Sequence, residues 1–239
     1  MSKRQILREK RLKQQKQQRL IIIAMVIIGA LLITAAMIYP TIKPVGDIVN
    51  ITPHTFNTTV NMNTLGDPDA PVIVEVWEDF QCSACVTYSQ EIETLLITNY
   101  VETGKINYSY RHYAFIDSMD PNGESQQSAN ASMCAGDQGR FWDYHDILFA
   151  NWNGSNRGAF SERRLMAYAE TLGLDMSNFR TCFNENPYVD EIAQDFEEGQ
   201  AIGVSGTPSI FVNGVQVTPG FVPSFEQLAS IIDDALAGE

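Results

Sequence analysis

Two cysteines that lie three positions apart are the residues of this chain with the clearest capacity for chemistry. Cys82 and Cys85 fall in the stretch EDFQCSACVTYSQEIETLL, residues 78–96, after an apolar run and before a helical pattern. A thiol at the start of a helix faces unpaired backbone N–H groups and the positive end of the helix dipole, and both favour the thiolate. We therefore expect a lowered pKa for Cys82, with Cys85 one turn later and within reach of a disulfide.

Three kinds of site share this spacing: a metal site, a structural disulfide and a redox pair. A zinc site needs two more ligands at suitable spacing, and the other cysteines and the three histidines are scattered along the chain. A disulfide that closes so short a loop contributes little to stability. The pattern therefore favours redox chemistry, for which we expect no metal and no organic cofactor.

The elements that must position this pair follow from the residue pattern on either side of it. Residues 72–80, VIVEVWEDF, have the β-branched and aromatic content of a buried strand. Residues 82–101 keep the apolar spacing of a helix, and residues 104–113, GKINYSYRHY, return to strand. This order predicts a parallel βαβ unit with the cysteines at the end of its first strand.

Helical segments dominate the next part of the chain. They lie near residues 124–135, 140–151, 161–172, 176–184 and 188–202. This is too much helix for one crossover connection, so we interpret it as a helical subdomain inserted into an α/β domain.

Strand character occurs at both edges of this domain. Residues 58–62 predict an edge strand. Residues 208–213 and 215–218 predict two strands joined by an Asn213-Gly214 turn, and a final helix over 224–236 begins with a capping-box pattern.

The N-terminal residues carry the signature of a membrane anchor. Residues 1–19 hold eight of the 16 basic residues and one of the 29 acidic residues, which leaves a net charge of −20 for the rest of the chain. Residues 20–39, LIIIAMVIIGALLITAAMIY, carry no charge and span ~30 Å as a helix, the thickness of the hydrocarbon core. The pattern favours an anchor over a cleaved signal, with a cytoplasmic basic arm and an extracytoplasmic remainder, single-pass in the cell membrane.

The remainder of the chain divides into a linker and a folded domain. Residues 40–57 carry three prolines and no clear period, which predicts a tether. The change of pattern near residue 58 indicates that the domain spans 58–239. Its acidic charge argues against nucleic acid as a partner and is the ordinary charge of a soluble domain.

Three stretches together resemble the membrane-anchored, DsbA-like thiol–disulfide oxidoreductases of bacteria: WEDFQCSAC, CAGDQGRFWDYHDILF and GVSGTPSIFVNG. The resemblance covers about residues 58–239. It implies an α/β, thioredoxin-like fold with a helical subdomain inserted at about 118–190, here preceded by a single N-terminal transmembrane helix. It also implies oxidation of thiols in unfolded or reduced exported proteins, and re-oxidation by a quinone-linked membrane partner.

The resemblance assigns roles by position. It implies that Cys82 is the nucleophile that forms mixed disulfides and that Cys85 is the resolving, more buried thiol. Pro208 matches the cis-proline of the family, which lies against the cysteine pair, and Thr207 precedes it. Glu78 precedes the motif, and two interpretations stay open for it: a buried carboxylate that takes the proton of Cys85, or a solvated strand end.

The residues between the cysteines depart from the family pattern. Strong oxidants of the family carry a Pro-His pair there, whereas this chain has Ser83 and Ala84. Without an imidazolium between the sulfurs, we expect a less lowered pKa of Cys82 and a less oxidising couple. The direction of catalysis therefore stays open, because reduction potentials on this scaffold span roughly 150 mV.

Two further groups of residues need an interpretation. Cys134 and Cys182 are 48 positions apart; a structural disulfide between them is favoured, with a second redox pair and two free thiols as alternatives. In FWDYHDILF, residues 141–149, one helical face is predicted to be core, and His145 and His112 are predicted to be polar edge residues.

The leading hypothesis is an extracytoplasmic enzyme that introduces disulfides into exported proteins. A substrate thiolate would attack the Cys82–Cys85 disulfide at Cys82, and a second substrate thiolate would release Cys82. A disulfide reductase or isomerase on the same scaffold is one alternative. A tethered binding or chaperone module whose cysteines only hold the fold together is the other.

Overall fold

The computed structural model of the chain describes residues 3–42, 45–118, 120, 122–219 and 221–238. The chain divides into two compact units, Met1–Gly46 and Asp47–Glu239.

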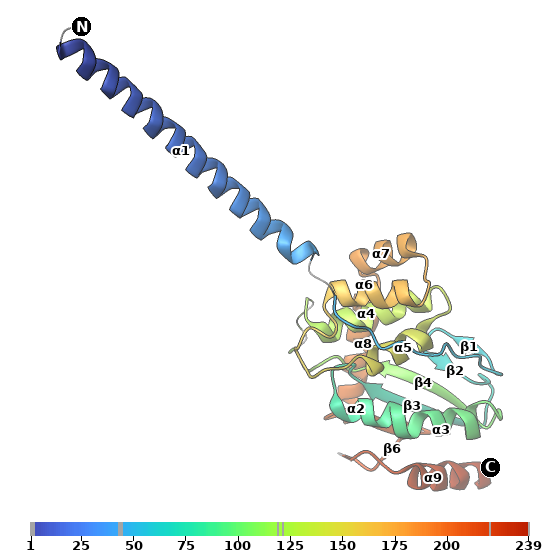
Figure 1. Cartoon of the computed structure of the whole chain (residues 1–239). Coiled ribbons are helices and arrows are strands. Elements are labelled where there is room, and N and C mark those ends of the chain that lie inside the picture. Colours follow the sequence, from blue (N-terminus) through green and yellow to red (C-terminus); the bar gives the residue numbers. More distant parts are fainter. Residues whose placement is uncertain (1–2, 43–44, 119, 121, 220, 239) are drawn as a thin grey trace. The chain divides into compact units, whose positions relative to one another are not determined.

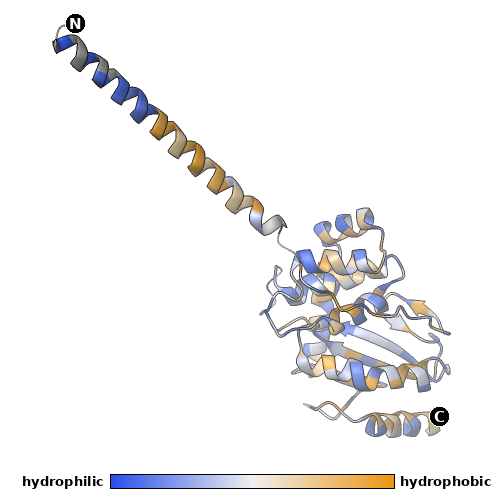
Figure 2. Cartoon of the chain, in the orientation of Figure 1, coloured by the Kyte–Doolittle hydropathy of each residue, from blue (hydrophilic) through white to orange (hydrophobic). Residues whose placement is uncertain are grey.

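The first unit is dominated by one long helix, α1 (Lys3–Ile42). Its segment Lys13–Tyr39 is long and apolar enough to cross a membrane, by length and composition. Figure 2 shows the polar beginning of this helix and the apolar stretch that follows it. The apolar side chains of this stretch are exposed, Leu20 and Leu32 among them. This agrees in length and composition with the anchor predicted at residues 20–39.

The second unit is built on a six-stranded mixed sheet (Figure 1). Its strands are β1 (Val60–Asn61), β2 (Thr64–Leu65), β3 (Val72–Glu78), β4 (Ile106–His112), β5 (Ser209–Val212) and β6 (Val215–Val217). They are ordered β1-β2-β4-β3-β5-β6. β3 pairs with β4 in parallel and with β5 in antiparallel orientation. The predicted parallel βαβ unit is therefore confirmed, with its first strand in the middle of the sheet.

The helix that follows β3 differs from a regular α-helix. It runs without a break through α2 (Ser83–Tyr88), η1 (Ser89–Glu93), α3 (Thr94–Leu96) and η2 (Ile97–Val101), of which η1 and η2 are π-helical turns. The predicted helix over 82–101 is confirmed, but its periodicity does not reveal the π turns. Such turns occur often at functional sites. Here η1 carries Glu93, which is only 3% exposed.

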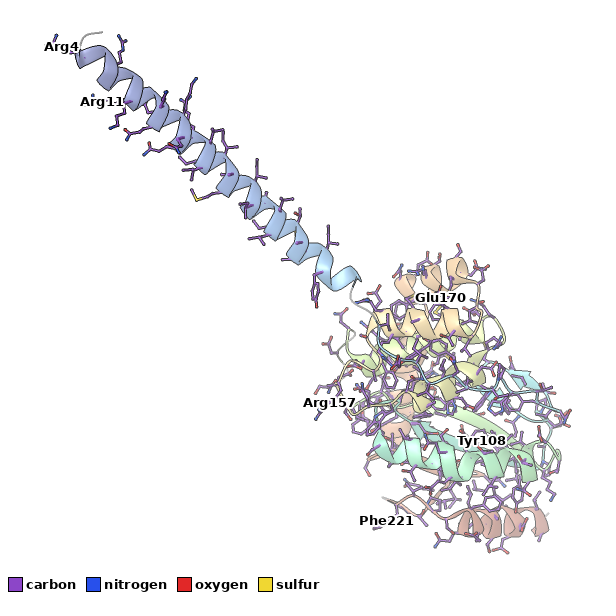
Figure 3. All side chains as sticks on the ribbon, viewed as in Figure 1. Arg4, Arg11, Tyr108, Arg157, Glu170 and Phe221 are labelled. Carbon is purple, nitrogen blue, oxygen red and sulfur yellow. A yellow bond between two sulfur atoms is a disulfide. The ribbon has the colours of Figure 1, made fainter. Side chains whose placement is uncertain are left out.

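The residues that the structure describes between β4 and β5 include five helices, which agree with the predicted helical segments. They are α4 (Glu124–Gly136), α5 (Phe141–Ala150), α6 (Glu162–Thr171), α7 (Met176–Glu185) and α8 (Val189–Ala201). A disulfide between Cys134 and Cys182 joins α4 to α7, with a Cα–Cα distance of 5.8 Å. The space around the sheet is filled by side chains of these helices and of the helix after β3. Figure 3 shows this packing and labels Tyr108 of β4 within it.

The C-terminal elements have the local signals that the sequence predicts. Asn213 and Gly214 both have positive φ, 48° and 76°, as a tight hairpin turn between β5 and β6 requires. In α9 (Phe225–Ala237) the Ser224 hydroxyl accepts from the backbone N–H of Gln227, and the Gln227 side chain accepts from the backbone N–H of Ser224. This is the predicted capping box.

The stretch that precedes β1 is more ordered than a tether. Ile48, Ile51 and Phe56 pack against the core of the second unit. The Val49 N–H donates to Asn151 Oδ1 at 2.9 Å, and the His54 N–H donates to Asp143 Oδ1 at 2.8 Å. Because α5 and the residue directly after it satisfy these backbone groups, residues 47–57 belong to the folded unit, where the sequence predicts a linker.

Candidate active site

The last residues of β3 organise the loop that leads to the cysteines. Asp79 is buried, and its carboxylate accepts from the N–H groups of Gln81, Phe115 and Ile116 at 2.8, 2.9 and 3.0 Å. The Ser125 hydroxyl donates to the same carboxylate at 2.8 Å. Burial raises the pKa of Asp79 to about 6, although these hydrogen bonds favour its ionised form. Asp79 therefore holds the loop in place, since its oxygens are already engaged.

Cys82 is the residue that caps the N-terminus of α2, as predicted. Its backbone is extended, with φ −79° and ψ 122°, and its side chain is half-buried. The S–H group donates to the carbonyl oxygen of Thr207 at 3.2 Å. Cys82 and Cys85 are both free thiols in this structure.

The two sulfurs have opposite electrostatic environments. A hydrogen bond from the Cys85 thiol is the largest effect on Cys82, and it lowers the pKa against the opposing effect of burial. The nearby Thr207 side chain and the N–H groups of Cys85 and Ala84 lower the pKa of Cys82 further, to about 6. Burial raises the pKa of the Cys85 thiol well above its usual range, and the neighbouring Cys82 and Glu78 act in the same direction. One sulfur therefore ionises easily, while the other keeps its proton.

The start of the helix contributes to this pKa but does not dominate it. The sequence indicates that the N–H groups at the helix start are the main stabiliser of the thiolate. In the structure their effect ranks below that of the Cys85 thiol. Cys85 lies one helical turn after Cys82 on the same face, so its S–H group reaches the Cys82 sulfur directly. The value of about 6 lies between those of ~7 for thioredoxin and ~3.5 for DsbA.

The loop before β5 brings Thr207 and Pro208 to the cysteines. β5 is antiparallel to β3 with Trp77 opposite Ser209, so residues just before β5 meet residues just after β3. The Thr207–Pro208 peptide bond is cis, and Pro208 is buried. The Thr207 hydroxyl is buried without a hydrogen-bond partner among the described residues.

Glu78 is a buried carboxyl rather than a solvated strand end. It is 1% exposed, and neither carboxyl oxygen has a partner with ordinary hydrogen-bond geometry among the described residues. Burial raises the pKa of Glu78 well above its usual range, and the charge of Glu93 acts in the same direction. The Cys85 thiol approaches closely enough to oppose this shift as a hydrogen-bonding neighbour. Of the two interpretations that the sequence leaves open, the structure therefore supports the buried one.

The prediction that His112 and His145 are polar edge residues is wrong. They are 1% and 0% exposed. His145 lies among the rings of Phe80, Tyr110 and Phe149, with centroid distances of 5.8, 5.4 and 4.8 Å. The predicted core face of α5 includes His145, and this face packs toward the sheet. Burial lowers the pKa of His112 to about 3, which keeps that imidazole neutral.

Glu93 is a buried ionisable residue near the site that the sequence does not single out. Tyr108 Oη donates to Glu93 Oε1 at 2.6 Å, and Glu93 Oε2 lies 3.5 Å from His145 Nε2. A signal was present in its spacing, because Glu93 follows Ser89 by four positions and precedes Leu96 by three. Those neighbours are on the buried face of the helix.

Comparisons with known proteins agree with the fold described above. A family model described as thioredoxin matches residues 58–234. The chain belongs to the thioredoxin family. Disulfide bond formation protein D of Bacillus subtilis is 23% identical over 178 residues, which cover 73% of this chain and 77% of that protein.

Solved structures of DsbA-like proteins share the fold. BdbD from Bacillus subtilis in its oxidised form superposes with a TM-score of 0.64 at 20% identity, over 81% of this chain and 100% of that one. DsbA from Chlamydia trachomatis gives 0.62 at 22% identity, over 79% of this chain and 99% of that one. The predicted thioredoxin-like fold class is thus confirmed, and DsbA-like proteins are among the structures that share it.

Two of the relatives are much longer than this chain. The Na(+)/H(+) antiporter NhaA 1 of Salinispora arenicola is 34% identical over 173 residues, which cover 72% of this chain and 24% of the antiporter. NhaA 3 of Salinispora tropica is also 34% identical, over 62% of this chain and 21% of that protein. The chain therefore spans less than a quarter of the length of these two relatives.

Proposed function

We propose that this protein catalyses thiol–disulfide exchange and introduces disulfides into exported proteins through Cys82 and Cys85. The observation that carries the proposal is the unequal environment of the two sulfurs. A half-buried Cys82 at the start of α2 ionises near pH 6, beside a fully buried Cys85 that holds its proton. Nucleophilic attack and leaving-group chemistry in disulfide exchange both depend on such a difference.

The exchange begins with the protein in its disulfide form. A substrate thiolate attacks Cys82 Sγ, the Cys82–Cys85 bond breaks, and Cys85 leaves as a thiolate that needs a proton. Glu78 supplies that proton, because its carboxyl is buried beside Cys85 and has a raised pKa. A second substrate thiolate then attacks the substrate sulfur of the mixed disulfide and releases Cys82, which leaves well because its own pKa is low.

Thr207 and Pro208 are proposed to line the place where the substrate chain approaches. The Thr207 carbonyl lies 3.2 Å from Cys82 Sγ, so a peptide bound through a mixed disulfide must pass beside it. Backbone groups at this place can hydrogen-bond an extended peptide irrespective of its sequence. This arrangement suits an enzyme that acts on many unfolded chains.

The location and the partners belong to the same proposal. The basic residues before the apolar segment of α1 support a single-pass anchor with its N-terminus in the cytoplasm. The second unit then lies outside, where disulfides persist. By resemblance to the family, a quinone-linked membrane protein re-oxidises the Cys82–Cys85 pair. Protease added to intact cells should then degrade the second unit and spare the basic arm.

The decisive experiment traps the mixed disulfide. In a Cys85→Ala variant, Cys82 should stay bonded to substrates, and these complexes should be visible on non-reducing gels and identifiable by mass spectrometry. A Cys82→Ala variant is the control and should trap nothing. The absence of complexes from cells that express Cys85→Ala would reject the proposal.

A reduction potential separates the directions of catalysis. Equilibration with glutathione buffers should place the couple between those of thioredoxin and DsbA, in line with the intermediate pKa of Cys82. A potential as low as ~−270 mV would instead favour a reductase. A tethered binding module predicts a third result, in which Cys82 of the reduced protein resists alkylation at neutral pH.

A further inference from the structure

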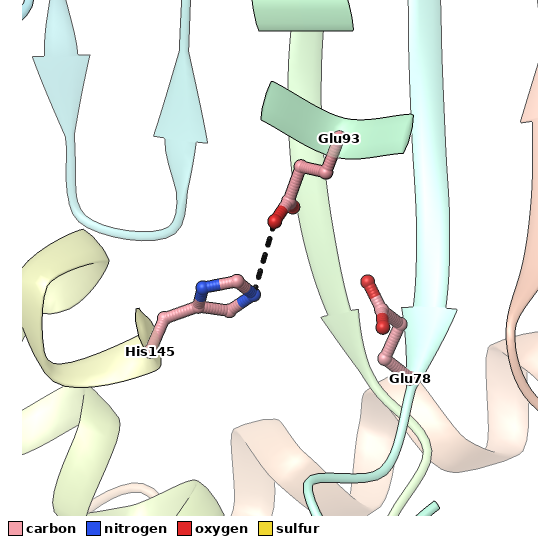
Figure 4. A group of neighbouring side chains, drawn as sticks. All are labelled: Glu78, Glu93 and His145. Atoms are coloured by element: carbon pink, nitrogen blue, oxygen red, sulfur yellow. Dashed lines mark ion pairs between the residues drawn. The ribbon is translucent and has the colours of Figure 1, made fainter. Parts of the chain in front are cut away.

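Three buried ionisable side chains, one of which neighbours Cys85, meet in the interior and are drawn in Figure 4. Glu78 comes from β3, Glu93 from η1 and His145 from α5, and we refer to them as the buried triad. They are 1%, 3% and 0% exposed. Their oxygen and nitrogen atoms lie within 4.8 Å of one another, and Figure 4 marks the contact between Glu93 and His145. Burying two carboxyls and an imidazole is costly unless they share protons or charge.

The triad connects to the surface through two further side chains. His145 Nδ1 lies 2.9 Å from Asp146 Oδ1, and Asp146 Oδ2 lies 2.5 Å from His54 Nε2. Asp146 and His54, which we call the outer pair, have side chains that are 29% and 34% exposed. The ring of His145 thus faces Asp146 with Nδ1 and Glu93 with Nε2, the latter at 3.5 Å and without a hydrogen bond of ordinary geometry. An imidazole can accept a proton on one side and release one on the other.

A surface pocket of about 190 Å³ connects the triad and the outer pair to solvent. Both members of the outer pair line it, as does Glu93. Its other walls come from the segment after the anchor, from the helix after β3 and from α5, with Ile51, Ser89 and Trp142 among them. Solvent in the pocket can therefore exchange protons with the outer pair.

The inner end of the same chain is the site of the proposed reaction. Cys85 is fully buried and approaches Glu78, the only triad member on β3. A proton taken by Cys85 from Glu78 must be replaced before the next turnover. Glu78 has no exposed surface of its own to do this, and its oxygens lack another hydrogen-bond partner among the residues described.

We propose that the buried triad and the outer pair form a proton path that links Cys85 to solvent in the surface pocket. The inference rests on the proposed function. When a substrate thiolate bonds to Cys82 and the bond between the cysteines breaks, the electron pair goes to Cys85, which takes the proton of Glu78. Glu78 regains a proton from the Glu93–His145 pair, and the outer pair passes one in from the pocket. During re-oxidation the proton leaves by the same route.

Each element packed around His145 places a titratable group near it, so protons have defined neighbours along the path. These groups are Glu93 from η1, Glu78 from β3, Asp146 from α5 itself, His54 from the segment after the anchor, and His112 and Tyr110 from β4. Burial lowers the pKa of His112 to about 3, so this imidazole stays neutral and we do not include it in the path.

The test measures how fast the Cys82–Cys85 disulfide is reduced, because this reaction needs a proton for Cys85. The full chain in detergent, with the Cys82–Cys85 disulfide formed, is mixed with dithiothreitol and quenched with acid. The protein is then freed of dithiothreitol and alkylated at neutral pH, and new thiols at Cys82 and Cys85 are counted by mass spectrometry. His54→Ala and Asp146→Asn should slow the reduction by about tenfold, since proton transfer has become limiting. Their solvent deuterium isotope effects should rise above that of the unmodified chain.

Chemical rescue distinguishes a loss of proton transfer from a loss of packing. Imidazole in the buffer can enter the space left by His54→Ala and should restore most of the rate, whereas loss of packing alone would not respond. Asp143→Asn is the matched control. It removes a neighbouring charge on α5 but keeps the oxygen that accepts from the His54 N–H, so its rate should equal that of the unmodified chain.

Three outcomes would overturn the path. One is an unchanged rate and isotope effect in both variants. Another is slowing that imidazole does not reverse and that Asp143→Asn shares. A third is one equivalent of a metal ion in the purified protein that Glu93→Gln removes, because the triad would then be a metal site. If the Cys85→Ala variant still traps substrates in these cases, the path fails while the proposed function stands.

Discussion

Cys82 and Cys85 lie three positions apart at the start of α2, whereas Cys134 and Cys182 join α4 to α7 across 48 positions. The first pair is present as free thiols, one half-buried and one buried; the second pair is bonded. The first pair has a carboxyl beside it and the carbonyl of Thr207 at 3.2 Å. The second lies on two packed helices, with Cys134 1% exposed.

Under the proposed function, one type of bond has two purposes in this protein. A disulfide across a long loop removes many conformations from the unfolded chain, so breaking it costs stability. A disulfide across a short loop removes few, so it can open and close with little effect on the fold. What it needs instead is an unequal pair of sulfurs and a source of protons. The comparison therefore predicts that the two pairs respond oppositely to substitution.

The largest expected effect is on activity. Cys82→Ser should reduce the oxidation of a dithiol peptide to the uncatalysed rate, because the attacked sulfur is gone. The double variant Cys134→Ser/Cys182→Ser should keep most of the activity of whatever fraction remains folded. Activity that survives in Cys82→Ser and disappears in the double variant would reverse the assignment of the two pairs.

The next effect is on stability. Removing the bond between α4 and α7 should lower the free energy of unfolding by about 2–4 kcal/mol, given the length of the closed loop, and the melting temperature by roughly 5–15 °C. Denaturant unfolding of the double variant and of Cys82→Ser measures the contrast. If Cys82→Ser were destabilised as much as the double variant, the proposed division of roles would not hold.

A smaller effect should separate proton supply from nucleophilicity. Glu78→Gln should slow reduction of the Cys82–Cys85 disulfide by about 10–100-fold, because an amide cannot donate the proton. Glu75→Gln on the same strand is the matched control. Equal rates in the two variants would show that Cys85 gets its proton elsewhere.

Glu78→Gln should also change how the free energy of unfolding depends on pH. The pKa of Glu78 is raised in the folded protein, so the folded state keeps this proton to higher pH than the unfolded chain. Its contribution is fully present below the ordinary value of 4.5 and is lost as the pH rises toward the folded pKa. The unmodified chain therefore loses this contribution as the pH rises above 4.5, and Glu78→Gln should gain stability relative to it over the same range. A difference that is constant with pH would contradict the buried, protonated carboxyl.

The smallest expected effect is a shift in the pH at which Cys82 ionises. The rate of Cys82 alkylation in the reduced protein should have its midpoint near pH 6 and fall about tenfold for each further unit of acidity, since only the thiolate reacts. Cys85→Ala should move the midpoint upward, because it removes the hydrogen bond with the largest effect. A midpoint of ~8.5 in the unmodified chain, as for an ordinary cysteine, would exclude the activated sulfur.

Prediction from sequence succeeded where the signal is local. The capping box at Ser224, the Asn213-Gly214 turn and the helical segments around Cys134 and Cys182 each depend on residues a few positions apart. It was wrong for His112 and His145, because polarity suggested an edge and only packing against distant aromatic rings buries them. It assigned residues 40–57 to a tether, since the side chains that hold residues 47–57, Asp143 of α5 and Asn151 directly after it, are about a hundred positions away.

The sequence by itself determined the cysteine pair at a strand-to-helix junction, the apolar helix near the N-terminus and the alternation of strands and helices, because spacing and composition encode them. Only the tertiary structure decided which ionisable groups are buried around the pair. The environment of Glu78, Glu93 and His145 depends on three elements that meet from distant parts of the chain. A pKa is set by such neighbours and by the loss of water, and neither is written in the local sequence.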